Sequence, residues 1–295
     1  MEYEDYTATS QTYDNIRVPI GLDSLDRALA TAAESAGLPS ARDLRVLDVG
    51  CGTGNYIDAL KDRVGKCSGL EFNEGMLSQS QAKHAGDPRV ALHHGSVLDM
   101  SCFSDESFNT VIMTQVMHHL TPDMHRRALS EMGRVLKPGG TVWIQTQTPH
   151  QHVQGFWWTS LIPMAAAVLA ARFPSLPLLQ RQLATADLAM TALDVPAAPL
   201  VRLDAYLNIE GPFSEVYRAA DSTWALASDE ELAAGLAWWR TEIEAGRAQT
   251  FLQEREKTRE QVGQTTAVTA TKLVGMAPDA CSAAALPAVN VEPFT

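Results

Sequence analysis

The order of apolar and polar positions divides the first half of the chain into short β-branched runs and longer stretches with helical spacing. Val46, Leu47 and Val49 form a run too short and too β-branched for a helix, so we expect a buried parallel strand. The same approach predicts strands over residues 45–49, 67–72, 90–94, 108–114 and 141–146, and helices over 22–33, 55–63, 74–84 and 121–136. This alternation is typical of an α/β fold with a parallel sheet.

The second half has a different pattern. No Asp, Glu, Lys or Arg occurs between Thr141 and Ala171, but Pro163 interrupts the apolar stretch, so we expect cap helices rather than a membrane span. Ser228 to Glu231 reads as a capping box that starts a helix. The later pattern predicts helices over 176–188, 229–245 and 248–261, a sixth strand over 190–195, and a last strand over 264–274.

Three alternate glycines, Gly50, Gly52 and Gly54, follow the first strand. Glycine allows a tight turn and a close approach of the backbone to a ligand, and the free N–H groups of the next helix would face that ligand. A dinucleotide fold favours the spacing Gly-x-Gly-x-x-Gly. The spacing here is Gly-x-Gly-x-Gly, with Asp48 just before it, and this disfavours a nicotinamide-dependent oxidoreductase.

The string Leu-Asp-Val-Gly-Cys-Gly-Thr-Gly at 47–54 resembles the first motif of class I S-adenosylmethionine-dependent methyltransferases. The resemblance covers about residues 13–147, and the string His118-His119-Leu120 is similar to the small-molecule branch that includes the ubiquinone and menaquinone methyltransferases. It implies an α/β, Rossmann-like, seven-stranded and mostly parallel sheet with helices on both faces. A helical cap would be inserted after the fifth strand.

On this basis we expect five parts along the chain. They are an N-terminal lid at 1–21, a cofactor-binding core at 22–147, a helical cap with the sixth strand at 148–262, the last core strand at 263–274, and a disordered tail at 275–295.

The resemblance also implies which residues hold S-adenosyl-L-methionine and its product S-adenosyl-L-homocysteine. Glu71, at the end of the second strand, would accept from both ribose hydroxyls. Tyr13 with Asp14 and Arg17 would fold over the cofactor as a lid, or this segment could instead be a surface arm whose aromatic side chains pack on the core. Ser96 departs from the commoner Asp of the family. The full set of cofactor-binding candidates is Tyr13, Asp48, Gly50, Cys51, Gly52, Glu71, Phe72, Met76, Ser96, Val97 and Gln115.

The acceptor side is less determined by the sequence. His119, His150 and His152 are candidate general bases, and each could instead be a packed or capping histidine. Trp157 and Trp158 could face the site, where aromatic rings attract a sulfonium, or they could seal the cap against the sheet. His118 and Glu210 complete the substrate-binding candidates, although Glu210 could instead be a solvated acid on the surface.

Composition limits the partners. The formal charge of −12 argues against a nucleic acid partner. Cys51, Cys67, Cys102 and Cys281 lack metal-type spacing and fit reduced thiols in a cytoplasmic protein, and no metal is expected. We expect a small-molecule substrate and no stable membrane insertion, and the sequence leaves open a homodimer.

Taken together, the sequence predicts transfer of a methyl group to a small, apolar or neutral metabolite, with O, S, N or C as the acceptor atom. The alternative from another class is a protein that binds S-adenosylmethionine without turnover.

Overall fold

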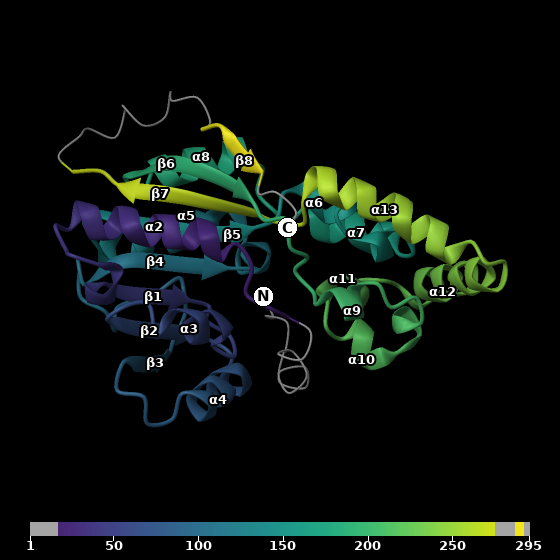
Figure 1. Cartoon of the computed structure of the whole chain (residues 1–295), viewed down its shortest axis with the longest axis horizontal. Coiled ribbons are helices and arrows are strands. Elements are labelled where there is room, and N and C mark those ends of the chain that lie inside the picture. The colour runs from purple at the N-terminus through teal and green to yellow at the C-terminus, as the bar shows by residue number, and fades with distance from the viewer. Residues whose placement is uncertain (1–16, 275–286, 292–295) are drawn as a thin grey trace.

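The computed structural model describes residues 17–274 and 287–291. Within these ranges the chain forms an α/β layer and a helical cap that lies beyond one end of the sheet (Figure 1). Tyr13, Asp14 and most of the expected lid at 1–21 lie outside the described residues. The described helices include none that is both long and apolar enough to cross a membrane.

The sheet has the strand order β3-β2-β1-β4-β5-β7-β6-β8. Its strands β1 to β5 are parallel, β7 runs antiparallel between β5 and β6, and β8 pairs in parallel with β6. Their bounds are β1 Arg45–Val49, β2 Lys66–Glu71, β3 Val90–His94, β4 Phe108–Thr114, β5 Leu136–Thr146, β6 Leu188–Val195, β7 Thr266–Lys272 and β8 Val289–Val291. The expected seven-stranded, mostly parallel sheet is confirmed, and β8 adds an eighth strand.

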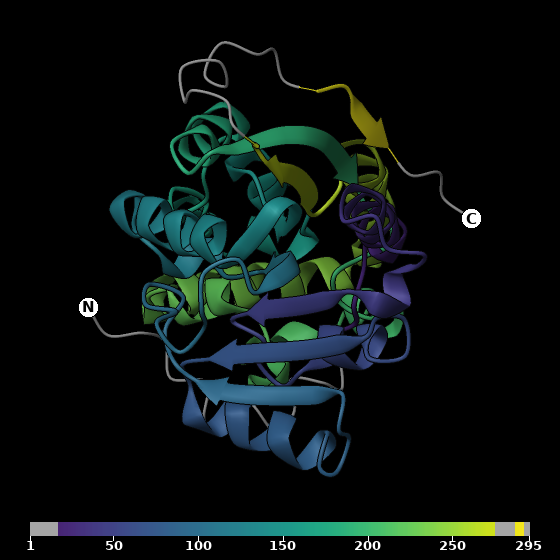
Figure 2. The same ribbon diagram turned by 90° about the vertical axis from the view of Figure 1, so that its left-hand side faces the viewer.

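The strand β8 corrects one expectation, because it belongs to the tail that we expected to be disordered. It lies at the edge of the sheet opposite α4 (Glu74–Lys83), which packs beside β3 (Figures 1 and 2). Pairing with β6 satisfies backbone groups that an edge strand would otherwise expose.

Helices cover both faces of the sheet because its strands are apolar on both sides. One face packs against α2 (Leu22–Ser35) and α3 (Asn55–Leu60), with Trp143 and Ile112 in that core. The other face packs against α5 (Pro122–Val135) and α8 (Leu176–Ala184), with Val142 and Val268 in the second core.

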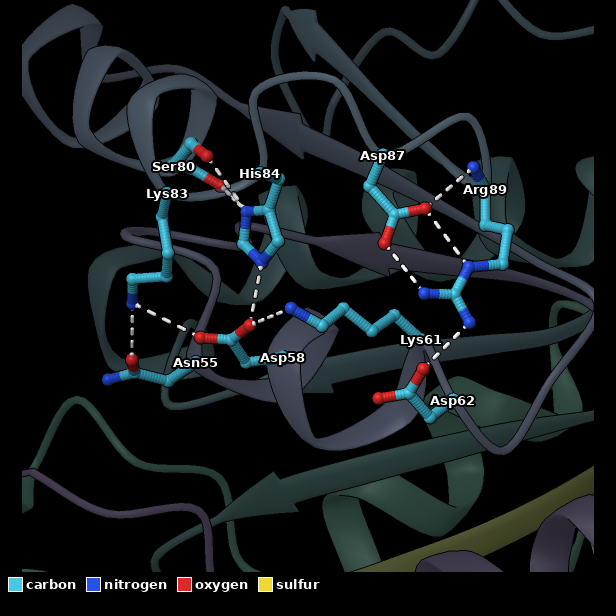
Figure 3. Close-up of polar contacts among 9 residues, drawn as sticks. All are labelled: Asn55, Asp58, Lys61, Asp62, Ser80, Lys83, His84, Asp87 and Arg89. Atoms are coloured by element: carbon cyan, nitrogen blue, oxygen red, sulfur yellow. Dashed lines mark hydrogen bonds and ion pairs between the residues drawn. The ribbon is translucent and has the colours of Figure 1, made fainter.

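A polar network joins α3 to α4 (Figure 3). His84 lies 2.8 Å from the carbonyl of Ser80 through Nδ1 and 3.3 Å from the Asp58 carboxylate through Nε2. Lys61 pairs with the same carboxylate at 2.7 Å, and Lys83 donates to Asn55. The first helix after the turn is therefore held by the next helix along the chain.

Beyond the carboxyl ends of the parallel strands, the cap is built from two segments, one after β5 and one after β6 (Figure 1). Its core contains Trp157, Trp158, Tyr206, Trp224 and Trp239. The helical elements are α6 Pro149–Gln154, η3 Trp157–Ser160, α7 Pro163–Ala170, α9 Leu203–Tyr206, η4 Gly211–Phe213, α10 Glu215–Arg218, α11 Ser222–Ala225, α12 Asp229–Glu244 and α13 Ala248–Val262. Between the two segments, α8 and β6 return to the sheet layer.

Two helix ends differ from the prediction. The helix expected over 55–63 ends at Leu60, because the chain turns there so that the backbone N–H groups of Gly65 and Lys66 bind the carbonyl of Leu44. The helix expected over 176–188 ends at Ala184, because Asp187 adopts a left-handed conformation with φ of 57° and directs the chain into β6.

The fifth strand also starts earlier than expected. Residues Lys137 to Gly140, which lie between the expected helix and the expected strand, are part of β5, and the pairing with β4 shifts register between Phe108 and Thr110.

Candidate active site

A cavity of about 580 Å³ lies between the carboxyl ends of the strands and the cap. Its walls come from the loops after β1 to β5, from the cap, and from Arg17 at the start of the described chain. The lining residues are Arg17, Gly50, Gly52, Glu71, Phe72, Asn73, Glu74, Met76, Ser96, Val97, Thr114, Gln115, Val116, His118, His119, Leu120, Gln147, His152, Leu169, Phe173, Ala220, Asp221 and Ser222.

The glycine turn forms one end of this cavity. Gly50 and Gly52 both have positive φ, at 73° and 55°. A Cβ at Gly50 would lie 2.4 Å from Cγ2 of Val116, whereas a Cβ at Gly52 would meet no atom within 4 Å. The turn is therefore packed on its Gly50 side and open at Gly52, where a ligand can approach the backbone.

Glu71 is in contact with this turn. One carboxylate oxygen accepts from the backbone N–H of Gly52 at 2.9 Å, and the other accepts from the N–H of Asn73 at 2.7 Å. An ionised carboxylate has further acceptor capacity beyond these two bonds. The acid from the second strand and the turn from the first strand thus form one polar surface at the cavity wall.

The next part of the wall suits a flat, apolar group. Phe72 is 49% exposed and stacks on His94, with 6.2 Å between ring centroids, while Met76 and Val97 are buried beside it. The Ser96 hydroxyl accepts from its own loop, from the N–H of Leu98 at 3.1 Å.

Asp48 and Cys51 are buried at the turn and do not line the cavity. Neither carboxylate oxygen of Asp48 has a hydrogen-bond partner among the described residues. Burial, and next the charge of Glu71, raise the pKa of Asp48 to about 8. Burial also raises the pKa of the Cys51 thiol. A neighbouring cation would favour the ionised form of Asp48.

Histidines form the other end of the cavity. The rings of His118 and His119 are 3.9 Å apart, and Phe173 packs 5.0 Å from His118 and 5.3 Å from His152. Burial lowers the pKa of His118 well below its usual range, and the neighbouring histidines and arginines add to this; burial also lowers the pKa of His152. These two rings are therefore neutral at neutral pH. Groups of three or more His, Cys, Asp or Glu that could hold a metal ion do not occur among the described residues.

Arg17 closes one side of the cavity. It donates to the carbonyl of Ala220 at 3.0 Å and lies 3.5 Å from the carboxylate of Asp221. A backbone bridge from Arg17 to Val201 also joins the N-terminal segment to the cap. Because Asp221 offsets the guanidinium charge, the acceptor end of the cavity is close to neutral.

The structure brings most of the predicted residues together. His118, His119 and His152 line the cavity, as do Gly50, Gly52, Glu71, Phe72, Met76, Ser96, Val97 and Gln115. Gln115 has a positive φ of 53°, which is uncommon for a residue with a side chain and marks the end of β4 as a constrained position.

Four predicted residues lie elsewhere, and the structure corrects them. His150 is exposed on α6, and Glu210 is exposed and 3.5 Å from Arg240. Trp157 and Trp158 are buried in the cap core, where Trp157 donates to the carbonyl of Tyr206 at 2.6 Å. Burial of these rings inside the cap, away from the cavity, explains the aromatic cluster.

Several lining residues were missed. Gln147, Leu169, Phe173 and Asp221 reach the cavity from four separate positions. Gln147 directly follows the fifth strand, and a polar residue at a strand's carboxyl end is a signal that could have identified it. The other three have no such signal, because their positions depend on how the cap folds back.

Comparison with known proteins fits this geometry. Residues 46–140 match the family described as a methyltransferase domain. The solved structure of a putative methyltransferase from an antibiotic biosynthesis pathway of Anabaena variabilis aligns with a TM-score of 0.64 at 20% identity, over 87% of this chain and 99% of that chain. Residues 46–140 are thus similar to a methyltransferase domain, and the chain shares its fold with that solved structure.

Two curated relatives make the similarity more specific. A demethylmenaquinone methyltransferase of Clavibacter sepedonicus is 34% identical over 47% of this chain and 55% of the relative, and one of Staphylococcus aureus is 38% identical over 37% and 45%. The core thus resembles quinone methyltransferases. The chain spans about half the length of these relatives.

Proposed function

We propose that this protein transfers a methyl group from S-adenosylmethionine to a small, largely neutral acceptor held between the glycine turn and the cap. The observation that supports this most directly is the contact between the backbone N–H of Gly52 and the carboxylate of Glu71 at the wall of a cavity. The match of residues 46–140 to a methyltransferase domain covers both residues.

The residues present fit the cofactor. The open side of Gly52 and the unpartnered carboxylate of Asp48 suit its amino-acid end, and Glu71 would accept from the ribose hydroxyls. Phe72 and Met76 would pack on the adenine. When bound, S-adenosylmethionine supplies an electrophilic methyl group on a positively charged sulfur.

The protein's own contribution is alignment and exclusion of water. The leaving group of the displacement is a neutral thioether that needs no proton, so holding acceptor and methyl in line is the main requirement, and such positioning can contribute about 7–11 kcal/mol. Leu169 and Phe173 give the cavity an apolar end, which suits an acceptor without fixed charge. This space also argues against a protein that only binds the cofactor.

The family match ends at residue 140, before the cap begins. The acceptor is therefore inferred from the cavity itself. A quinol-type acceptor, as the names of the curated relatives suggest, would meet the same apolar and neutral surface.

Titration calorimetry with S-adenosylhomocysteine tests the cofactor assignment. We expect wild-type protein to bind it, and Glu71→Gln to weaken binding at least tenfold, because one carboxylate oxygen becomes a donor. Glu210→Gln, on the exposed surface of the cap, is the matched control and should bind like wild type. Equal affinity in Glu71→Gln and wild type, or preference for NADH over S-adenosylhomocysteine, would contradict the proposal.

A further inference from the structure

The third glycine of the turn faces a helix instead of the cavity. Gly54 has a φ of 82° and begins α3, but it does not line the cavity as Gly50 and Gly52 do. A Cβ at Gly54 would lie 2.5 Å from Oγ of Ser80 and 2.6 Å from Cε1 of His84. Ser80 lies in α4 and His84 is the C-cap of that helix, so the close approach of α4 requires glycine at this position.

One face of α4 contacts both the cavity and the turn. Met76, Ser80 and His84 follow one another at intervals of four residues, and helical geometry places such residues on the same face. All three are buried. Met76 lines the cavity beside Phe72, whereas Ser80 and His84 pack on Gly54. A shift of α4 against the turn would therefore also move the wall of the cavity.

The ring of His84 is oriented within α4 and directed at α3. Nδ1 lies 2.8 Å from the backbone carbonyl of Ser80, which can only accept, so Nδ1 carries a proton. Nε2 is buried and lies 3.3 Å from the carboxylate of Asp58 in the first turn of α3 (Figure 3). The contact with Ser80 orients the ring, and the contact with Asp58 joins the two helices.

The charges around Asp58 make it a suitable acceptor for this ring. Lys61 on α3 and Lys83 on α4 lie 2.7 Å and 4.0 Å from its carboxylate. Burial raises the pKa of Asp58, but the hydrogen bond from Lys61 and the charges of His84, Lys61 and Lys83 outweigh burial and lower this pKa below its ordinary value. The carboxylate is therefore ionised at neutral pH and suits a ring that carries a proton on Nε2.

We propose that His84 is a positioning residue for cofactor binding. Through Asp58 it holds α3 to α4, and it thereby keeps the glycine turn and the wall at Met76 at the spacing that one molecule of S-adenosylmethionine needs to contact both. His84 does not line the cavity and touches no reacting atom. This inference rests on the proposed methyl transfer and adds a residue outside the cavity to the cofactor site.

The two ends of the cofactor would contact different parts of this assembly. The amino-acid end would lie at Gly52, which leads into α3, and the adenine would lie at Met76 in the first turn of α4. Glu71 links the two parts near the ribose, because it accepts from the N–H groups of Gly52 and Asn73. His84 supplies a second link at the other end of α4. Two links fix the angle between the parts, whereas one link would leave them free to pivot.

Calorimetry with two ligands tests this role. S-adenosylhomocysteine must contact both parts, whereas adenosine needs only the adenine and ribose side. We expect His84→Ala to weaken binding of S-adenosylhomocysteine about tenfold, as contacts remote from a ligand can, and to change binding of adenosine by less than about twofold. Damage to the adenine wall alone would weaken both ligands equally, and that result would overturn the proposal. Wild-type affinity for S-adenosylhomocysteine in His84→Ala would overturn it as well.

Conservative variants identify which ring nitrogen matters. The amide nitrogen of His84→Gln can take the position of Nε2 and donate to Asp58, whereas that of His84→Asn lies near the position of Nδ1 and reaches only the carbonyl of Ser80. We expect His84→Gln to restore most of the affinity and His84→Asn to bind as weakly as His84→Ala. Equal affinity of the Gln and Asn variants, or the opposite order, would overturn the role given to Asp58.

Asp58→Asn and Asp62→Asn form a matched pair. Asp62 lies just after α3 and pairs with Arg89 at 2.7 Å, in a group of contacts separate from His84 (Figure 3). We expect Asp58→Asn to weaken binding of S-adenosylhomocysteine and Asp62→Asn to bind it like wild type, and equal affinity of the two contradicts the proposal. Urea unfolding checks that each variant is folded at the temperature of the titration.

The same titrations separate the two ideas. If wild-type protein does not bind S-adenosylhomocysteine, methyl transfer itself is contradicted. If wild type binds it and the His84 variants bind it equally well, only the positioning role of His84 is contradicted.

Discussion

At the scale of single residues, Gly52 in the turn and Gly37 just after α2 allow the cost of backbone strain to be separated from the loss of ligand binding. Gly52→Ala and Gly37→Ala each place a side chain at positive φ, 55° and 63°, with no atom within 4 Å of the new Cβ. Both should therefore lose about 1–2 kcal/mol of stability. Only Gly52→Ala should also weaken binding of S-adenosylhomocysteine, because its methyl group enters the cavity. Urea unfolding and calorimetry on the two variants measure the two effects, and equal binding in both would contradict the position given to the ligand.

The raised pKa of Asp48 predicts that the protein releases a proton when the cofactor binds. With its pKa raised to about 8, the carboxyl group is protonated at pH 7 in the ligand-free protein. A bound cation favours the ionised form and lowers this pKa, so binding of S-adenosylmethionine should release up to one proton. Calorimetry at pH 7 in buffers of different ionisation enthalpy measures that number. Asp48→Asn should release none, and a wild-type value of zero would show that no cation comes near Asp48.

At this scale the sequence was informative wherever a residue type is required by backbone geometry or by its position on a strand. Gly50 and Gly52 follow β1 and Glu71 ends β2, and the carboxyl ends of these strands meet at one edge of the sheet, so the proximity of the three residues was predictable. Phe173 and Asp221 were not predictable, because each lies on a cap segment whose approach to the cavity is set by tertiary packing. His150 and His152 differ by two residues, and the short helix α6 turns one to solvent and the other to the cavity.

At the scale of elements, Glu231 belongs to a sequence pattern that correctly predicts the start of α12, but its side chain caps a different helix. Ser228 caps α12 as predicted, accepting from the N–H of Glu231 at 3.1 Å. The Glu231 carboxylate, however, accepts from the backbone of Met164 at 2.6 Å and of Ala165 at 3.2 Å. It therefore caps α7, because these N–H groups lie in the first turn of that helix and have no partner within it.

Glu231→Ala should destabilise the cap by about 1 kcal/mol, because two backbone donors lose their acceptor. Glu230→Ala removes the same charge from the same turn of α12 without this contact and serves as the control. Tryptophan fluorescence during urea unfolding reports the cap directly, since Trp157, Trp158, Trp224 and Trp239 are in its core. Equal midpoints for the two variants would show that capping of α7 contributes nothing measurable.

Strands and helices were predicted best where the pattern repeats within the element. The strands at 90–94 and 108–114 match β3 and β4 at both ends. Prediction failed at β8 and at the start of β5, because the pairing partner in the sheet determines those bounds. The sequence of a strand does not indicate which other strand it will pair with in the sheet.

At the scale of the whole molecule, four buried groups give the stability of the ligand-free protein two opposite dependences on pH. Burial lowers the pKa of His118, His125 and His152. As pH falls below about 6.5, these histidines therefore bind protons in the unfolded chain but stay neutral in the native state. Burial and the charge of Glu71 raise the pKa of Asp48 from 3.8 to about 8, so the native state keeps a proton that the unfolded chain has lost. Stability from the histidines is lost as pH falls, and stability from protonated Asp48 is lost as pH rises.

The pH of maximum stability depends on the balance between the three histidines and Asp48. Below pH 6.5 up to three histidines outweigh one carboxyl group, so the free energy of unfolding should rise with pH. Between pH 6.5 and 8 the contribution of these histidines levels off, and Asp48 should lower the free energy of unfolding by about 2 kcal/mol, at up to 1.4 kcal/mol per pH unit. Urea unfolding across pH 5 to 8 measures the curve. Asp48→Asn should abolish the decline above pH 6.5 and keep the rise below it, whereas Asp204→Asn should show both; a decline that persists in Asp48→Asn would assign the alkaline loss to another group.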